Sequence, residues 1–320
     1  MNRRTSAIPV SSRQRGVALI TALIVLAIAA TLSAAMIWEG SLDTRRTGTL
    51  IQGNQAMEYA LGAESWAEQI LLRDVQKNPG IIDLGQDWAQ QLPPLPVEGG
   101  QIIGHIEDMQ GRFNLDTLAP GQAQSVYKLQ FGRLLKALNL DPSIADAVSD
   151  WMNTNTVASP NGAKDDFYSR LQPPYLTAMA PMTSVSELEL VKGVTPQVYA
   201  ALAPYVCAIP VNTNPGGGQS QGGWGLNFNT ASPLLLMTLA DNITEDQAAQ
   251  VVAARANQGI TQAQFTSIIK APNGPPAVPT SSYFMLTVTA EIGSTHVTLY
   301  SLLNLTGNTV KAVRRTFGTL

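Results

Sequence analysis

Cysteine, histidine and charged side chains are all scarce in this sequence of 320 residues. Cys207 is the single cysteine, so no disulfide can form within the chain. The two histidines, His105 and His296, are widely separated, which argues against a zinc site of ordinary ligand spacing. Charged residues make up only 13% of the chain and the net charge is −3. This composition argues against a protein whose main task is to coat nucleic acid or an anionic membrane.

Signatures of catalysis are missing as well. No phosphate-binding loop or dinucleotide fingerprint occurs, and neither histidine stands in a nucleophile motif. His105 falls in a predicted strand, where a lone histidine is more often a surface or packing residue than a catalyst. We therefore expect a protein that is not an enzyme.

The amino-terminal region contains one long apolar segment, Val17–Trp38, which lacks charge, proline and glycine. About 20 helical residues cross the hydrocarbon core of a bilayer, so this segment predicts a membrane-spanning helix. The residues before it carry four arginines and no acid, which predicts that they stay in the cytoplasm. An ordinary single-pass anchor remains an alternative. So does a secretory signal cut near Ser33-Ala34-Ala35.

The basic stretch ends in Gly16, directly beside the apolar run. This arrangement resembles the prepilins, in which a membrane peptidase cuts after the glycine and leaves the helix on the mature protein. The resemblance implies cleavage between Gly16 and Val17, with N-methylation of Val17. Most pilins have Glu at the fifth mature position, where this chain has Thr21. The resemblance implies that Thr21 removes one docking contact, as suits a subunit at the end of a filament.

Two further segments narrow the resemblance. Gln52–Ala67 (QGNQAMEYALGAESWA) is similar to a "QA-x-x-YA-x-GAE-x-WA" segment of the same family, and Asp108–Leu115 (DMQGRFNL) matches its "D-x-x-GRFNLN" signature, with Asp116 in place of the last Asn. The chain thus resembles the minor pseudopilin K family of type II secretion systems, whose members also lack the Glu at the fifth position.

Periodicity predicts an α+β fold. A long first helix runs to about Asp74 and stops at Asn78-Pro79-Gly80; Gln101–Leu118 reads as a strand, a turn at Gln110-Gly111 and a second short strand. Helices are expected at about Ala123–Leu138, from Asp141-Pro142, and at Ser186–Val191, Pro196–Leu202, Ser232–Leu239, Glu245–Asn257 and Thr261–Ile269. A three-strand meander follows over Tyr283–Glu291, His296–Leu305 and Thr309–Phe317.

These elements suggest a pilin-like long helix with a small antiparallel sheet, into which a large helical domain is inserted. We expect a leader over 1–16, a transmembrane and assembly helix over 17–38, a pilin-like α/β domain over 39–119 and 272–320, and an inserted helical domain over 120–271. Asn212–Gly225, rich in glycine, is expected to be a flexible loop between two halves of the insertion.

Oxygen-bearing side chains cluster in Asp150–Tyr168 (DWMNTNTVASPNGAKDDFY). Such side chains in a glycine-containing loop suit a hard cation, and the segment resembles the calcium loop of the family, "DW-x-D-x-D … GAED-x-YY". The candidate calcium ligands are Asp150, Asn153, Asn155, Asp165 and Asp166. Asparagines replace two acids of that pattern and Lys164 replaces its Glu, so a hydrogen-bonded loop without metal remains the alternative.

A second motif has a rival interpretation. Asn227–Ala231 (NFNTA) and the helices that follow resemble one helix-hairpin-helix or SAM-like unit, and Ser184–Leu202 is a weaker second copy. Such units present backbone N–H groups to DNA phosphate. Here the turn is acidic, and Arg255 is the only cation between Thr230 and Phe265. We therefore expect no nucleic-acid binding.

The resemblance implies a minor pseudopilin that initiates or caps the pseudopilus at its tip, for protein export across the outer membrane. The implied partners are minor pseudopilins of the I and J types, the major pseudopilin, the prepilin peptidase and N-methyltransferase, the inner-membrane assembly platform, secreted cargo and the outer-membrane secretin. The implied location is the bacterial inner membrane, with the globular part in the periplasm. The alternative is a minor pilin of a type IV pilus or DNA-uptake system.

Overall fold

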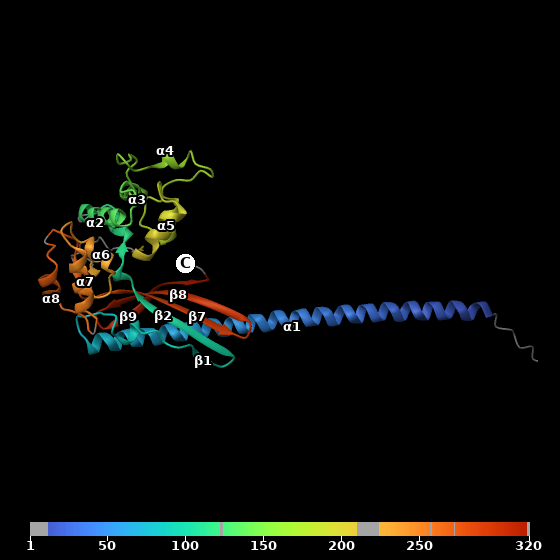
Figure 1. The fold of residues 1–320 in the computed structure, drawn as a ribbon. Coiled ribbons are helices and arrows are strands. Elements are labelled where there is room, and N and C mark those ends of the chain that lie inside the picture. Colours follow the sequence, from blue (N-terminus) through green and yellow to red (C-terminus); the bar gives the residue numbers. More distant parts are fainter. Residues whose placement is uncertain (1–11, 122–123, 210–223, 257, 272, 319–320) are drawn as a thin grey trace, which may run out of the picture.

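The structure, a computed structural model, describes residues 12–121, 124–209, 224–256, 258–271 and 273–318. Its dominant element is helix α1 (Ser12–Lys77), whose 66 residues make it roughly 100 Å long. Figure 1 shows that the amino-terminal part of α1 projects alone, while its other end lies against the rest of the molecule. α1 continues three residues beyond the predicted end, and it stops before the predicted Asn78-Pro79-Gly80 breaker.

The sheet has five antiparallel strands in the order β1-β2-β7-β8-β9. They are β1 (Leu95–Val97), β2 (Gly100–Asp108), β7 (Tyr283–Ile292), β8 (Thr295–Thr306) and β9 (Thr309–Phe317). The strands β7, β8 and β9 confirm the predicted meander. Gly293 and Gly307, at the two predicted turns, have φ of 56° and 58°, a left-handed conformation that glycine adopts without steric cost.

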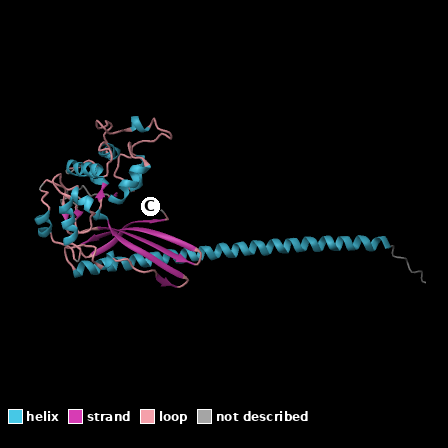
Figure 2. Cartoon of the chain, viewed as in Figure 1, coloured by secondary structure: helices cyan, strands magenta, loops and turns pink. Residues whose placement is uncertain are grey.

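One face of the sheet packs against α1 (Figure 2). Alternate residues of β7, such as Phe284, Leu286 and Val288, are buried with Ala56, Ala60 and Leu71 of α1, because successive side chains of a strand point to opposite faces. Small alanines on the helix allow its backbone to approach the strands closely.

Glu64 lies within this packed face of α1 and is buried. Its side chain is 4% exposed and accepts hydrogen bonds from Arg315 of β9, with Nη2 2.7 Å from Oε1. Ser301 of β8 also donates to Glu64. The register of α1 on the sheet is therefore set by a charge pair as well as by apolar packing.

A block of short helices lies between β2 and β7 in the sequence, and Figure 1 places it at the end of the molecule remote from the amino terminus. The helices are α2 (Gln124–Ala137), α3 (Ile144–Met152), α4 (Asp165–Tyr168), α5 (Pro196–Leu202), α6 (Pro233–Met237), α7 (Glu245–Ala254) and α8 (Gln262–Ile268). Capping boxes start two of them: Thr244 with Gln247 at α7, and Thr261 with Gln264 at α8. The apolar core of the helical block also includes Met109 and Phe113, which precede its first helix in the chain.

Several local expectations are corrected. Val185–Leu190 is a 3-10 helix where an α-helix was predicted, and α3 begins at Ile144, later than Asp141-Pro142. The second strand of Gln101–Leu118 is only β3 (Phe113–Asn114), and Leu115–Leu118 is a 3-10 turn. Most of the predicted Asn212–Gly225 loop lies outside the described residues.

Short parallel pairings connect distant segments, and the sequence did not predict them. β3 pairs with β4 (Val206–Cys207), and β5 (Leu226–Asn227) pairs with β6 (Ala277–Val278). Each pairing has two residues on each strand, too few to show an alternating pattern. These pairings hold the start, middle and end of the helical block together.

Candidate assembly helix and cation loop

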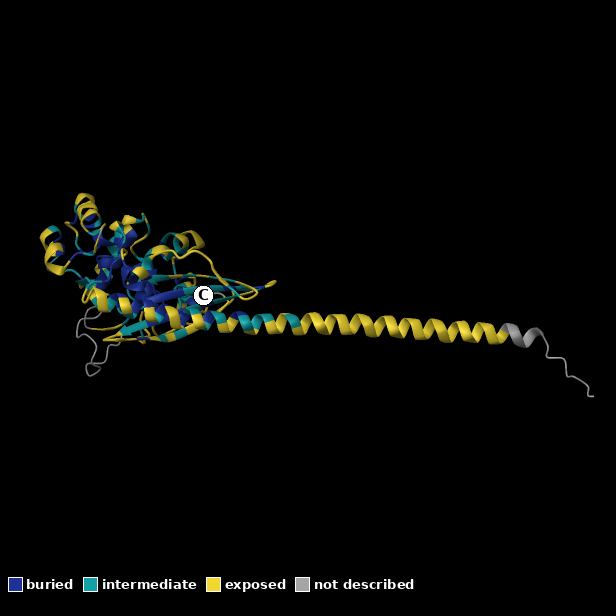
Figure 3. Cartoon of the chain, turned by 90° about the horizontal axis from the view of Figure 1, so that it is seen from below, coloured by how far each residue is buried: buried dark blue, intermediate teal, exposed yellow. Residues whose placement is uncertain are grey.

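The exposed half of α1 is the candidate membrane and assembly surface. Large apolar side chains from Val17 to Trp38 are all more than half exposed, and Figure 3 shows an exposed stretch that continues along this half of the helix. In the described part of the chain, α1 is the one helix long and apolar enough to cross a membrane by length and composition. Small residues, among them Ala27, Ala30 and Ala34, leave room for another helix to pack closely.

The predicted processing and assembly residues lie near the start of this helix. Gly16 and Val17 are consecutive residues of α1 in the uncut chain. Thr21 is also in α1, and its Oγ1 donates to the carbonyl of Ala18 at 3.0 Å. The hydroxyl of Thr21 is thus bonded to its own helix and carries no charge for the amine of a neighbouring subunit. Cleavage after Gly16 stays a prediction.

An apolar groove of about 390 Å³ lies where the other half of α1 meets β2. The helix contributes Tyr59, Ala63, Trp66 and Ile70, and β2 contributes Ile102 and Ile106. Trp88, Leu92 and Leu95, the last at the start of β1, line the groove from the part of the chain between α1 and β2. Trp66 is 47% exposed at its edge.

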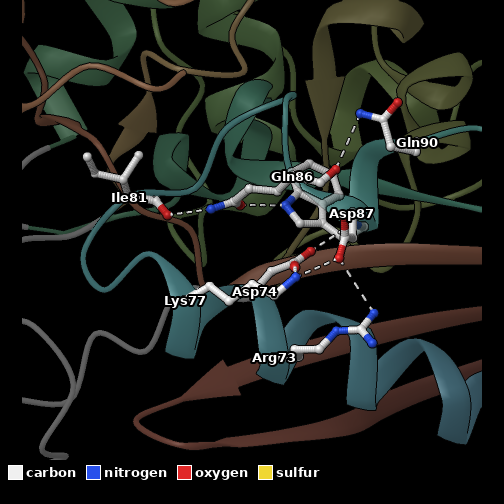
Figure 4. Close-up of polar contacts among 8 residues, drawn as sticks. Arg73, Asp74, Lys77, Ile81, Gln86, Asp87 and Gln90 are labelled. Atoms are coloured by element: carbon white, nitrogen blue, oxygen red, sulfur yellow. Dashed lines mark hydrogen bonds and ion pairs between the residues drawn. The ribbon is translucent and has the colours of Figure 1, made fainter. Parts of the chain in front are cut away.

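A polar network holds the connecting segment 81–90 against the end of α1 (Figure 4). The carboxylate of Asp74 accepts from the backbone N–H of Trp88 at 2.9 Å, and Lys77 Nζ lies 2.9 Å from Asp87 Oδ2. Gln86 accepts from the indole N–H of Trp88 at 2.8 Å and donates to the carbonyl of Ile81. This network fixes Trp88 as one wall of the groove.

The predicted cation loop connects α3 to α4. Asp150 is buried at the end of α3, and its two carboxylate oxygens accept from the backbone N–H and the hydroxyl of Ser159 at 2.7 and 2.8 Å. A Cβ on Gly162 would lie 1.7 Å from Asp150 Oδ2, so only glycine allows this approach. The carboxylate of Asp150 therefore links the start of the loop to its middle through its hydrogen bonds to Ser159.

Lys164 occupies the interior of the same loop. Its side chain is almost fully buried, and its ammonium donates to the carbonyls of Asp150, at 2.6 Å, and of Asn153. Asn153 Oδ1 accepts from the N–H of Asn155, which forms a local turn. The basic residue that replaced a Glu of the family pattern is thus the centre of the loop.

The remaining candidate ligands lie around this lysine without forming a metal cage. Asp165 Oδ1 accepts from the N–H and hydroxyl of Thr177 at 2.8 and 2.7 Å, and Asp166 is exposed. Among the described residues, no group of three or more His, Cys, Asp or Glu is arranged to hold a metal ion.

The loop as folded does not fit a divalent cation. An ion bound to the carbonyls of Asp150 and Asn153 would lie beside the Lys164 ammonium. Two unit charges about 4 Å apart repel by roughly 4 kcal/mol at the effective dielectric constant of a protein surface, and a divalent ion doubles this cost. Calcium binding stays a prediction that the arrangement of Lys164 opposes.

The Asn227–Ala231 motif is a structural joint in this chain. Asn227 is fully buried and its amide donates to Asp108 Oδ2 at 2.9 Å, to Ser281 Oγ and to the carbonyl of Ile82. Asn229 exchanges hydrogen bonds with the backbone of Ile260. These polar groups join β2, the helical block and the start of β7, and they are turned inward.

Arg255, the one cation of this segment, is also used internally. Its guanidinium donates to the carbonyls of Phe228 and Ala231, and burial lowers its pKa to about 10. The guanidinium N–H groups that would contact a phosphate are thus already bonded to backbone carbonyls.

The signature around GRFNL is similarly explained by packing. Phe113 is buried and stacks on Phe131 of α2 at 5.1 Å. Asn114 exchanges two hydrogen bonds with the backbone of Ile209, and Cys207 of β4 is buried. Burial raises the pKa of the Cys207 thiol well above its ordinary value, so the thiol stays protonated.

Sequence reasoning missed Lys192 and Arg315. Lys192 Nζ donates to the carbonyls of Gly162 at 3.0 Å and Asn161 at 3.4 Å, which ties the far arm of the loop to the segment after Leu190. Arg315 pairs with Glu64. Charge alone could not have identified them, because their partners lie 30 or more residues away in the chain.

The long apolar helix packed on an antiparallel sheet defines the class of pilin-like subunits, and comparisons with known proteins identify the branch. Residues 111–211 and 226–277 match the two regions of the family described as type II secretion system protein K. The chain is 34% identical to the type II secretion system protein K of Aeromonas hydrophila, with 92% of this chain and 94% of that protein covered. It is also 34% identical to that of Pectobacterium carotovorum, over 96% and 97%.

A solved structure has the same fold. It comes from the crystal structure of the GspK-GspI-GspJ complex of enterotoxigenic Escherichia coli, with a TM-score of 0.68 and 23% identity, and the match covers 86% of this chain and 100% of that chain. The chain belongs to the type II secretion system protein K family, and it is a minor pseudopilin of α+β fold.

Proposed function

We propose that this chain caps or initiates the pseudopilus as its tip subunit, and that its role is structural, without catalysis. The observation that carries the proposal is the position of the helical block, at the end of the molecule remote from the apolar half of α1 (Figure 1). A subunit packed by its amino-terminal helix into a filament would carry this block above the last subunit. The block would then obstruct the addition of a further subunit.

The proposal includes the route to that position. The prepilin peptidase cuts after Gly16, the apolar helix Val17–Trp38 anchors the chain in the inner membrane, and the globular part lies in the periplasm. Partner minor pseudopilins of the I and J types bind it, which is supported by the complex in which the GspK relative was solved. Close packing of α1 against their helices contributes to this binding. The further partners in this proposal are the major pseudopilin, the inner-membrane assembly platform, the secreted cargo and the outer-membrane secretin.

Filament length tests the tip role. In cells that overproduce the major pseudopilin, extra copies of a cap should shorten surface pseudopili, while an initiator should increase their number. An excess of processed chain that changes neither the length nor the number would contradict the proposal.

Partner contact is tested by crosslinking in membranes. Cys207 is 1% exposed, so a cysteine introduced at Ala34 of α1 is the accessible thiol. Ala34→Cys should form a disulfide with a cysteine placed at the same depth in a partner minor pseudopilin. Ser267→Cys, on the exposed side of α8, is the matched control that should not. Equal crosslinking at both positions would indicate nonspecific contact.

A further inference from the structure

The loop between α3 and α4 contains its own positive charge. Lys164 has 2% of its surface exposed, and Nζ donates to the carbonyls of Asp150 and Asn153. A buried ammonium is stable only where its charge and its N–H groups find partners. Here the partners are backbone oxygens, which are present whatever side chains the loop carries.

A second ammonium holds the other arm of the loop. Lys192 Nζ donates to the carbonyls of Gly162 and Asn161, and it lies 5.4 Å from the ring centre of Phe167. Lys164 and Lys192 together bind carbonyls at both ends of the stretch 150–162. Backbone carbonyls gathered around one positive centre are also what a hard metal ion would require.

The charges of the loop match an ammonium better than a divalent ion. Asn153 and Asn155 are neutral, Asp150 and Asp165 each accept hydrogen bonds from a hydroxyl and an N–H, and Asp166 is exposed. The carboxylate of Asp150, which is the buried acid of this loop, therefore already has its hydrogen-bond donors in Ser159. A divalent ion added beside Lys164 would leave the interior with excess positive charge.

We infer that Lys164, assisted by Lys192, is the built-in cation of this loop and makes its fold independent of divalent metal. The ammonium is attached to the chain, so it is present at a fixed position whatever the calcium concentration of the surroundings. The helical block of this chain then keeps its stability in conditions where a loop dependent on calcium would loosen.

The first test is thermal unfolding of the full native chain in detergent, with excess calcium and with excess chelator. The same Tm in both is expected. Terbium, which substitutes for calcium, should show no luminescence sensitised by Trp151 beside the loop. A Tm that rises with calcium, or Trp-sensitised terbium emission, would overturn the inference.

The second test removes the charge and keeps the length of the side chain. Lys164→Met leaves two carbonyls without a donor, so Tm should fall by roughly 4–8 °C with and without calcium. Lys270→Met, at an exposed position, is the matched control and should leave Tm unchanged. A Lys164→Met chain as stable as the native one would also overturn the inference. If that variant does not fold, the calcium and terbium measurements on the native chain still decide.

The third test converts the loop. Asn153→Asp with Lys164→Glu replaces the ammonium with acids, so stability should become dependent on calcium, with a higher Tm in calcium than in chelator. A converted chain that does not respond to calcium, or that stays unfolded in it, would show that the ammonium does not stand in place of a metal.

Discussion

Asp116 is a buried carboxyl group with one hydrogen-bond donor for its two oxygens. Oδ1 accepts from the N–H of Met182 at 2.8 Å, and Oδ2 has no partner. Burial, with a smaller contribution from Glu187, raises the pKa of Asp116 to about 7, against the opposing effects of the Met182 N–H and Arg314. Asp116 is the one residue of this segment that departs from the family's "GRFNLN" pattern. It places an acid where the pattern has a neutral amide.

This acid should make stability decline as the pH rises. The folded-state pKa lies above the unfolded one, so the folded chain binds more protons between pH ~4 and pH ~7, and stability falls across that window. Asp116→Asn keeps the acceptor for Met182 and should remove this slope, with a gain of up to roughly 4 kcal/mol at pH ~8 and little at pH ~4. Denaturant unfolding at both pH values measures it; an equal effect at both would contradict the assignment.

At the scale of elements, α1 is held on the sheet by the Glu64–Arg315 pair. Burial alone would raise the pKa of Glu64, but hydrogen bonds from Arg315 and Ser301 lower it below its ordinary value. The pair therefore stabilises the fold above the unfolded pKa of Glu64, and its contribution is lost as the pH falls through the lower folded value.

Removing Arg315 should leave a buried carboxylate without its charge partner. Because Arg315 is half exposed, Arg315→Ala should cost roughly 1–3 kcal/mol of unfolding free energy, less than for a fully buried pair. Adding Glu64→Gln to it should recover part of the loss, since the buried charge is gone. Arg46→Ala, whose partner Asp43 is exposed, is the control with almost no effect. Equal losses of unfolding free energy for the two arginine variants would contradict a larger stabilising contribution from the pair at Glu64.

The joint between the sheet and the helical block depends on Asn227. Asn227→Ala would remove the donor shared by Asp108, Ser281 and the carbonyl of Ile82, and it should lower the unfolding free energy by roughly 2–4 kcal/mol. Hydrogen exchange should then speed up on both β2 and α6. Asn155→Ala, at an exposed position, is the control. Faster exchange confined to the helical block would show that the joint lies elsewhere.

For the whole molecule, the division between an exposed apolar half of α1 and a packed half is what suits the chain to a filament. The same helix contributes the proposed membrane anchor and one layer of the pilin-like core. The helical block adds bulk at the far end.

Processing after Gly16 should be required for this chain to enter the filament. Gly16→Val should leave the leader uncut, because the proposed cut follows this glycine, and intact mass should then correspond to the full chain. Gly40→Val is the matched control, since a Cβ at Gly40 meets nothing within 4 Å. In the native chain, an amino terminus at Val17 that depends on the peptidase is expected. A start near Met36 would identify an ordinary secretory signal.

The sequence by itself determined the long helix, the three-strand meander and the family. These rest on local properties: an uncharged run, a period of two, and short motifs such as GRFNL. The tertiary structure alone decided what depends on partners far away in the chain. The two-residue pairings β3–β4 and β5–β6 are too short to leave a pattern, and the burial of Glu64 depends on Arg315, which is 251 residues away in the chain. Lys164 was recognised as a departure from an acidic pattern. Only folding shows that its ammonium lies inside the loop, because its acceptors are backbone carbonyls, which no side-chain pattern encodes.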